Sequence, residues 1–555
     1  MRHCEKIHGM RHRMPAYLLL LAVIAIPLGA CDRDNEVVDT HDAADSLIVL
    51  RRGNGGDPQT LDPARAEDTH AFRVLADLYE GLLILDATGN AIPGVAEEWE
   101  VSSDGLSYTF HLRANATWSN GKRVTAEHFV ASFERALLPA TASPYSFHLH
   151  PIQNAELVAK GDLPPSALGI AAPDAQTLTI ELDVPAPHLL SVLTMPVAFP
   201  IWPGALTNSD RFAAPQHFVG NGPFVLEEWQ PGYRIRLRKN GLYRETRSVH
   251  IDVVEYYAIQ DPLSELNMYR AGELDITTTV PGANFKDLRR TRRSELHVAP
   301  RLAIYYLAFD LSEAPFDNLP LRHALTMAID RESLVEIIGR GEQPAYGLVP
   351  DGVSGYAPAR YGWSALGNAE RQAEARRIFA GSGYSPAEPL QLKLTYDADD
   401  IHETVALAIS SMWRDVLGID VELDKREWKY FLDTRDRREE WQIMRFAWTG
   451  DYDHPGTFTG ILHSASPQNL PGYNSSRYDE LIDAAVATND ARAQSALFNS
   501  AEATMLSDYP IAPLYFYVSK HLVSPSVRGF QSNVLDQHPS RYLRLTKEPP
   551  IKSSD

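Results

Sequence analysis

Residues 444–458, MRFAWTGDYDHPGTF, place charged side chains in an aromatic segment, and these side chains could do chemistry. Asp451, Asp453 and His454 offer two carboxylates and an imidazole, which together can hold a metal cation. The same residue types before a proline commonly form turns and helix caps. Arg445 lies at the other end of the segment. The segment is therefore compatible with an ion pair, a metal corner or the two ends of a binding site.

Motifs for covalent or phosphate chemistry are absent from the sequence. It contains no G-x-S-x-G nucleophile elbow, no G-x-x-x-x-G-K-[ST] phosphate loop and no G-x-G-x-x-G dinucleotide loop. His402 and Glu403 begin like the zinc motif H-E-x-x-H, but the position of the second histidine holds Ala406. We therefore expect no enzyme, no cofactor and no metal, and a metal-dependent hydrolase built on residues 451–454 is a remote alternative.

The first thirty residues read as a secretory signal. A basic start is followed by an apolar run, which is too short for a comfortable membrane span. The run ends in Leu-Gly-Ala before Cys31, which resembles the lipobox of bacterial lipoproteins; a plain cleaved signal is the alternative. We expect a signal peptide over 1–30, lipidation at Cys31, and a flexible acidic tether over 31–45. Asp32 resembles a signal that retains lipoproteins on the inner membrane.

Composition limits the class of protein. The chain has 555 residues, enough for more than one large core, with 44% hydrophobic and 22% charged residues. Its formal net charge of −20 argues against nucleic acid as a partner, because phosphate binding needs a surplus of Lys and Arg. The two cysteines, Cys4 and Cys31, fall in or next to the signal, so we expect no disulfide in the mature chain.

The elements that position the charged segment alternate between strands and helices. Short strands are predicted at 47–50, 389–396, 418–424 and 441–448, and a hairpin at 99–112. Apolar residues at helical spacing predict helices over 72–85, after Thr125, and over 402–417 with Gly418 as the C-terminal cap. The pattern predicts a mixed α/β protein over the whole length.

Several longer motifs together resemble one family. They include TLDPARAEDTHAFRVLADLYEGLL, GLSYTFHLRANATWSNGKRVTAEHF, TASPY, GNGPFVLEEWQPGYRIRLRKN, YRAGELDI, LRHALTMAIDRESLV, EWKYFLDTR and WTGDYDHPGTF. In this order and spacing they resemble the oligopeptide-binding proteins of bacterial ABC importers, in the extracellular solute-binding protein family 5. The resemblance runs from about residue 47 to residue 545 and so covers nearly the whole mature chain.

The resemblance implies a two-lobed periplasmic-binding-protein-like α/β fold (type II, cluster C) with an extra subdomain. Lobe I would comprise 46–79, 204–302 and 519–555, the additional subdomain 80–203, and lobe II 303–518. A peptide cleft would lie between lobes I and II. The family also implies a monomer that captures short peptides outside the cytoplasm, held to the membrane by its lipid, and passes them to ABC permease subunits.

The resemblance further implies roles for single residues. Asp451 would pair with the α-ammonium of the peptide, because burying an unpaired terminus costs several kcal/mol. Arg445, His402 and Arg435 would meet its α-carboxylate. The main-chain and pocket residues would be Glu67, Thr69, Tyr145, Tyr306, Trp428, Ala447, Trp448 and Thr449.

Departures from the family pattern are also visible. Positions that carry a disulfide in some members are Ala303 and Thr449 here, an acid of some relatives is Ala308, and a nearby tyrosine is Arg301. If those positions line a pocket, lysine-rich peptides lose a partner. The alternative ligands are a murein peptide or a dipeptide, bound by the same fold in a sensing role.

Overall fold

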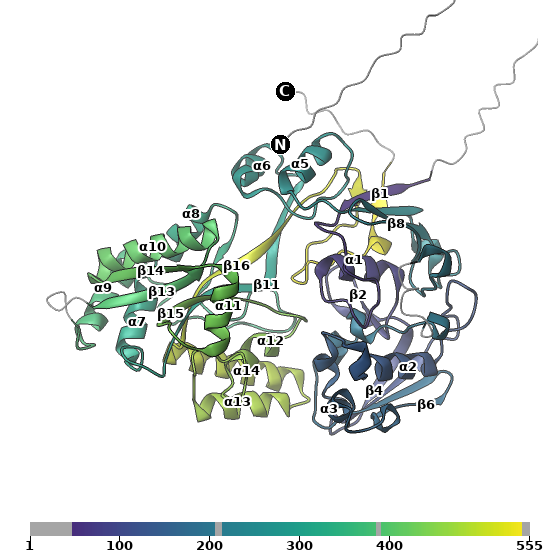
Figure 1. Ribbon diagram of the computed structural model, residues 1–555, viewed down its shortest axis with the longest axis horizontal. Coiled ribbons are helices and arrows are strands. Elements are labelled where there is room, and N and C mark those ends of the chain that lie inside the picture. Colours follow the sequence, from purple (N-terminus) through teal and green to yellow (C-terminus); the bar gives the residue numbers. More distant parts are fainter. Residues whose placement is uncertain (1–46, 206–213, 385–389, 547–555) are drawn as a thin grey trace, which may run out of the picture. The chain divides into compact units, whose positions relative to one another are not determined.

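The computed structural model describes residues 47–205, 214–384 and 390–546. The predicted signal, Cys31 and the tether lie outside the described residues, as do residues 46, 206–213 and 547–555 of the predicted lobe I and residues 385–389 of the predicted lobe II. The described chain mixes strands and helices throughout, as the sequence predicts (Figure 1). Among the described residues, no helix is both long and apolar enough to cross a bilayer.

Three larger sheets organise the strands. A four-stranded sheet has the order β1-β10-β9-β8, another has β4-β5-β7-β6, and a six-stranded sheet has β12-β16-β11-β15-β13-β14. Two small two-stranded sheets pair β2 with β3 and β17 with β18. The strands are β1 Val49–Gly53, β2 Leu83–Leu85, β3 Ala91–Pro93, β4 Ala96–Val101, β5 Ser107–Leu112, β6 Ile170–Asp174, β7 Thr177–Glu181, β8 Phe224–Gln230, β9 Arg234–Lys239, β10 Val253–Tyr257, β11 Leu296–Phe309, β12 Gln343–Pro344, β13 Gln391–Asp397, β14 Asp420–Arg426, β15 Ile443–Thr449, β16 Ile511–Leu522, β17 Val527–Arg528 and β18 Arg544–Leu545.

The helices pack around these sheets. They are α1 Thr69–Leu78, α2 Ala126–Leu137, α3 Ala155–Lys160, α4 Leu189–Val192, α5 Pro262–Arg270, α6 Phe285–Thr291, α7 Leu319–Ala328, α8 Arg331–Ile338, α9 Asn368–Ala380, α10 Asp400–Leu417, α11 Trp428–Arg437, α12 Gly456–Thr459, α13 Ser476–Val486 and α14 Ala491–Asp508. The predicted hairpin is confirmed as β4 and β5, and the predicted helices after Thr125 and over 402–417 are confirmed as α2 and α10. Gly418 caps α10 in the left-handed region, with φ of 70°.

The helix predicted over 72–85 is wrong in its second half. α1 ends at Leu78, Tyr79 is extended, and residues 83–85 form strand β2. Gly81 explains the break, because a side chain there would lie only 2.9 Å from the carbonyl oxygen of Leu193 and 3.0 Å from that of Leu83. The apolar residues keep their helical spacing past Gly81, but this spacing does not register the close backbone contacts at residue 81.

Buried side chains form two large cores and one small core. The first lies between Leu302 and Phe516 and surrounds the six-stranded sheet. The second runs from Leu50 to Leu543 and includes residues from both the predicted lobe I and the predicted additional subdomain. The third contains Leu266, Leu288 and Leu522. The long antiparallel pair β11 and β16 belongs to the six-stranded sheet, and the end of β16 at Leu522 reaches the third core.

Candidate functional site

A cavity of about 370 Å³ lies where side chains of both large cores meet. One part of its wall comes from α1 and from segments near residues 84, 145 and 195, and another from β11, the turn after β15, and residues 534–541. Its lining includes Thr69, Phe72, Tyr79, Ile84, Tyr145, Met195, Phe199, Arg301, Thr449, Asp451 and Asp453. The wall is mostly apolar, with few charged groups.

Asp451 reaches this cavity because the chain turns directly after β15. The amide of Gly450 donates to the carbonyl oxygen of Leu302 at 2.8 Å, which keeps the turn against β11. A Cβ at residue 450 would lie 2.8 Å from a methyl of Thr457, so this close approach requires glycine. The next residue, Asp451, then lines the cavity with its side chain 27% exposed.

The carboxylate of Asp451 has no charged partner of its own in the described structure. Burial raises its pKa, and a hydrogen bond from the hydroxyl of Tyr145 only partly offsets this effect. Burial, and then the charge of Asp451, raises the pKa of Tyr145 to about 12, so this hydroxyl remains a donor. A cation placed beside a half-buried carboxyl with a raised pKa would stabilise its ionised form.

His148 is a neighbour of Asp451 that the sequence analysis missed. Its Nε2 lies 3.7 Å from Oδ2 of Asp451, and the side chain is 5% exposed. Burial, and then the charge of His150, lowers the pKa of His148 to about 4, so the ring is neutral near pH 7. The only sequence signal was its position three residues after Tyr145.

The predicted carboxylate-binding cations lie apart from Asp451. Nε of Arg445 donates to Oδ1 of Asp397 at 2.5 Å, and Nδ1 of His402 lies 2.8 Å from the same oxygen. The Arg445 guanidinium lies over the ring of Phe431, 5.0 Å from its centroid. Arg445 therefore pairs with Asp397, at the end of β13, and not with Asp451; the sequence analysis missed Asp397 as the shared partner.

Arg435 is separate from this group. It lies on α11, where its guanidinium pairs with Asp436 at 2.7 Å and its side chain is 38% exposed. Trp428 begins the same helix, is 52% exposed, and stacks on Phe431. The role of Arg435 at the peptide carboxylate stays a prediction.

The remaining predicted residues occupy different environments. Thr69 and Thr449 line the cavity, as does Tyr145, whereas Glu67 is exposed just before α1. Ala447 is exposed on β15, and the indole of Trp448 donates to the carbonyl oxygen of Thr457 at 2.7 Å. Tyr306 is 4% exposed and packs on Phe446 within the first core, away from the cavity lining.

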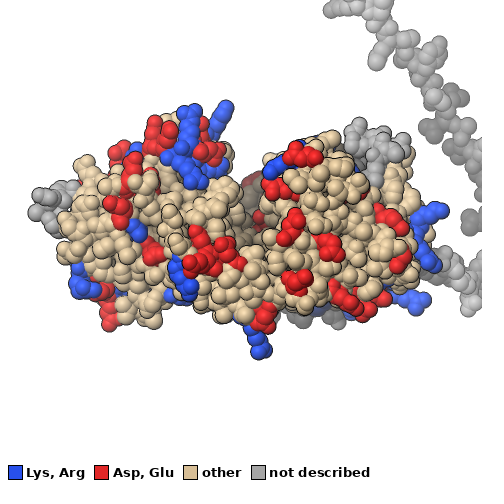
Figure 2. All heavy atoms as spheres, turned by 90° about the horizontal axis from the view of Figure 1, so that it is seen from below, with Lys and Arg blue, Asp and Glu red and all other residues tan. Residues whose placement is uncertain are grey.

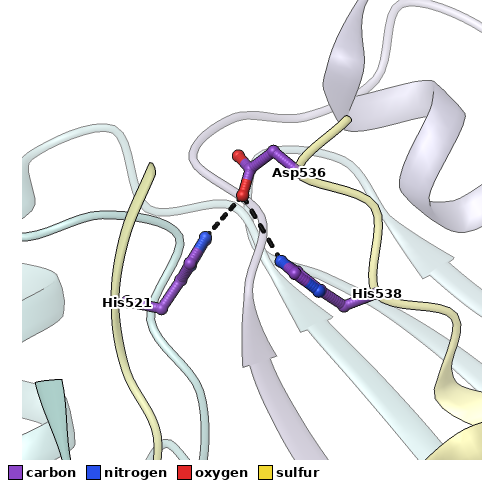
Figure 3. A group of neighbouring side chains, drawn as sticks. All are labelled: His521, Asp536 and His538. Atoms are coloured by element: carbon purple, nitrogen blue, oxygen red, sulfur yellow. Dashed lines mark hydrogen bonds and ion pairs between the residues drawn. The ribbon is translucent and has the colours of Figure 1, made fainter. Parts of the chain in front are cut away.

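The metal corner considered for Asp451, Asp453 and His454 does not form a shared ligand set. Asp453 accepts hydrogen bonds from the amide and hydroxyl of Ser354, and Nε2 of His454 lies 3.1 Å from Gln494. In the described part of the chain, the metal-ligating types converge instead at His521, Asp536 and His538 (Figure 3).

The cluster of His521, Asp536 and His538 is a buried ionic network. Oδ1 of Asp536 lies 2.6 Å from Nε2 of His521 and 3.3 Å from Nε2 of His538, as drawn in Figure 3. Burial alone would raise the pKa of Asp536, but the charge of His521 and hydrogen bonds from both rings hold it well below its usual range. Arg73 adds a further positive charge 3.8 Å away. The carboxylate is already satisfied by these groups.

The departures from the family pattern have clear positions. Ala303 and Thr449 are cross-strand partners in the β11–β15 ladder, and neither residue can form a disulfide. Ala308 is fully buried in the first core and does not line the cavity. Arg301 does line the cavity.

On the face drawn in Figure 2, acidic and basic side chains are interspersed, with no continuous basic surface.

A mixed α/β chain with two large cores and a cavity at their meeting point defines a two-lobed periplasmic binding protein. The model of the bacterial extracellular solute-binding proteins, family 5 Middle, matches residues 90–469, and the chain belongs to this family. Members of the family are substrate-binding proteins of ABC transporters and are not enzymes. The family also implies a place outside the cytoplasm.

Two relatives named for peptide ligands are similar over most of their length. The periplasmic oligopeptide-binding protein OppA of Salmonella typhimurium is 36% identical over 490 residues, covering 87% of this chain and 89% of that protein. The periplasmic murein peptide-binding protein MppA of Escherichia coli is 33% identical over 480 residues, covering 86% and 89%.

Solved structures of this group superpose well. The unliganded open form of MppA gives a TM-score of 0.85 at 32% identity, covering 91% of this chain and 98% of the other. A second structure of E. coli MppA gives 0.73 at 33% identity, covering 91% and 99%. Haemophilus influenzae OppA in complex with RPPGFSPFR gives 0.71 at 32% identity, covering 90% and 99%.

Proposed function

We propose that this protein captures short oligopeptides by their charged ends and delivers them to an ABC permease. The observation that carries the proposal is Asp451, a half-buried carboxylate without a cation, at the end of β15 and inside the cavity. An α-ammonium would supply the missing charge and three hydrogen-bond donors. The peptide main chain would then run beside β15, whose residues Ala447 and Thr449 are exposed.

For the other end of the peptide we propose Arg445, His402 and Arg435. The first two share the carboxylate of Asp397, and a ligand carboxylate would compete with or join this group, directly or through water. Arg445 lies near the start of β15 and Asp451 follows the turn at its end, so the two residues suit opposite ends of a short extended peptide.

We further propose that the described conformation is an open one and that the ligand favours closure. The greater likeness to an unliganded open form than to a peptide complex supports this view. A ligand shifts such an equilibrium only through contacts that differ between the two states, and the charged termini are the natural source. The lobe boundaries given above, the lipid at Cys31 and a monomeric state belong to the same proposal.

The test is peptide binding to wild-type protein and to Asp451→Asn, measured by calorimetry with trialanine. Losing one partner of a partly buried charge pair costs about 3–5 kcal/mol, so the variant should bind at least 100-fold more weakly. N-acetylated trialanine, which lacks the ammonium, should bind wild-type protein equally weakly. Equal affinity of the variant and wild type, or of both peptides, would overturn the role of Asp451.

A further inference from the structure

The cavity contains a second charged group without a partner. Four charged side chains line it: Asp451, Asp453, Arg301 and Arg541. Asp453 accepts from Ser354, and Arg541 donates to the hydroxyl of Tyr243 and to the carbonyl oxygen of Ala76. Among the described residues, none forms a hydrogen bond or an ion pair with the side chain of Arg301. The cavity therefore offers one cation without an anionic partner, Arg301, and two carboxylates that accept hydrogen bonds only from neutral hydroxyl and amide groups, Asp451 and Asp453.

The backbone of β11 explains why Arg301 faces the cavity. Its pairing with β16 is interrupted between Pro300 and Ile304, so the ladder is irregular in the stretch that contains Arg301. The amide of Leu302 donates instead to the carbonyl oxygen of Val534 at 2.9 Å, within the segment that lines the cavity. A regular strand at this point would have continued the ladder to β16.

The same strand places Arg301 beside the proposed ammonium site. Ala303 pairs with Thr449 in the β11–β15 ladder, and the amide of Gly450 donates to Leu302. Arg301 and Asp451 each lie two residues beyond this last pair of the ladder, and both line the same cavity. Their side chains form no ion pair with each other in the structure, so each is free to take a ligand group.

A second arginine, Arg73, lies close enough to Arg301 for the charge of Arg301 to affect its pKa. Burial first, and then the charges of Arg52 and Arg301, lowers the pKa of Arg73, against the opposing effect of Asp536. Arg73 has Asp536 at 3.8 Å as a partner, whereas Arg301 has none. A half-buried guanidinium in a mostly apolar wall is costly to leave without an anion, and a carboxylate that enters would gain bidentate hydrogen bonds.

We propose that Arg301 is a specificity-determining residue that binds an acidic side chain of the ligand. Because Arg301 and Asp451 line the same cavity, each two residues beyond the last pair of the β11–β15 ladder, that side chain belongs to the first or second residue of the peptide. The preferred ligands are short peptides with Asp or Glu near a free amino terminus. This inference rests on the proposed function, since it assumes that Asp451 holds the ammonium.

The test compares matched tripeptides by calorimetry. Glu-Ala-Ala and Ala-Glu-Ala are measured against Gln-Ala-Ala and Ala-Gln-Ala, with trialanine as the reference. A hydrogen bond to a charged group is worth about 1.5–3 kcal/mol, so at one of the two positions Glu should bind about 10-fold or more tightly than Gln. In Arg301→Gln the affinity of each Glu peptide relative to its Gln counterpart should fall to about one, whatever the affinity for trialanine.

Controls separate the possible failures. Arg289→Gln removes the same charge from an exposed position on α6 outside the cavity lining, and should leave the Glu advantage intact. Arg301→Lys keeps the charge and should retain part of the affinity advantage of the Glu peptides.

If trialanine binds but Glu and Gln peptides bind alike, the inference on Arg301 is wrong and the proposed function stands. If Arg301→Gln weakens dialanine but leaves the Glu advantage unchanged, Arg301 serves the carboxyl end of dipeptides and the inference is equally overturned. If no peptide binds to wild-type protein, the proposed function itself fails.

Discussion

Asp451 shows how a binding site is prepared at the cost of stability. Burial raises its pKa, so the neutral form of this carboxyl is favoured more strongly in the empty folded protein than for the same carboxyl in water. A carboxyl with a raised folded-state pKa stabilises the fold below its unfolded-state pKa and loses this contribution as the pH rises through the folded-state value. Near pH 7 the ionised Asp451 therefore weakens the empty protein, and an arriving ammonium removes the penalty.

This linkage predicts that peptide affinity depends on pH. An ammonium bound at Asp451 lowers the pKa of that carboxyl, so binding favours the ionised form. As the pH falls through the raised pKa of the empty protein, affinity for trialanine should fall, approaching 10-fold per pH unit below it. Titrations between pH 7 and pH 4 in buffers of different ionisation enthalpy would show proton release on binding in the acidic range. Constant affinity over this range would contradict the assignment.

The two sides of the site differed in how far the sequence could predict them. Asp451 and Tyr145 were found because they belong to contiguous motifs, WTGDY and TASPY. His148 and Asp397 were missed, since each gains its role from a chain segment far away in sequence. Arg301 was visible as a departure from the family pattern, but only the structure around the irregular stretch of β11 shows that it lines the cavity.

Strands and helices were predictable where one periodicity dominated. The amphipathic pattern of α10 and the alternation in β4 and β5 gave the right elements. The error after Leu78 arose because apolar spacing does not register the backbone contact at Gly81. The pairing order of the six-stranded sheet, with β15 between β11 and β13, connects distant segments and was not predicted from local sequence.

Asp397 joins three elements and should be important for stability. It ends β13, contacts His402 in the first turn of α10, and pairs with Arg445 of β15, which is 8% exposed. Replacing it with Ala leaves the Arg445 guanidinium buried and unpaired. The expected loss is about 3–5 kcal/mol in the free energy of unfolding.

Urea denaturation of Asp397→Ala would measure this loss. The double variant Asp397→Ala/Arg445→Met provides the control, because it removes both charges and keeps an apolar chain beside Phe431. The double variant should recover most of the lost stability. If it is as unstable as the single variant, the unpaired guanidinium is not the cause.

The molecule as a whole combines two large cores with charged networks at their borders. The second core contains side chains of both the predicted lobe I and the predicted additional subdomain, so these two parts share one apolar interior. The His521–Asp536–His538 cluster lies beside the end of β16 and the segment that lines the cavity. The cluster, the cavity wall and the long strands are thus neighbours in one connected region.

Buried histidines give the whole fold a sensitivity to acid. Burial lowers the pKa of His188 to about 3 and that of His538 to about 4. Because these folded-state values lie below the ordinary value of 6.5, the unfolded chain takes up more protons as the pH falls from about 6.5. Each ring therefore lowers the free energy of unfolding across this window. Buried carboxyls with raised pKa values, such as Glu502, act in the opposite direction, so a single variant is the sharper probe.

His188→Phe isolates one of these contributions. His188 stacks on Tyr452 with ring centroids 5.2 Å apart, and a phenyl ring can keep this contact without a titrating group. Between pH 7 and pH 5 the variant should gain about 2 kcal/mol of stability relative to wild type, since the unfolded wild-type chain is protonated at this residue and the folded one is not. Urea denaturation of both proteins at the two pH values measures the difference directly. The same difference at both pH values would mean that His188 is not held neutral by burial, and that the acid sensitivity of the fold has another origin.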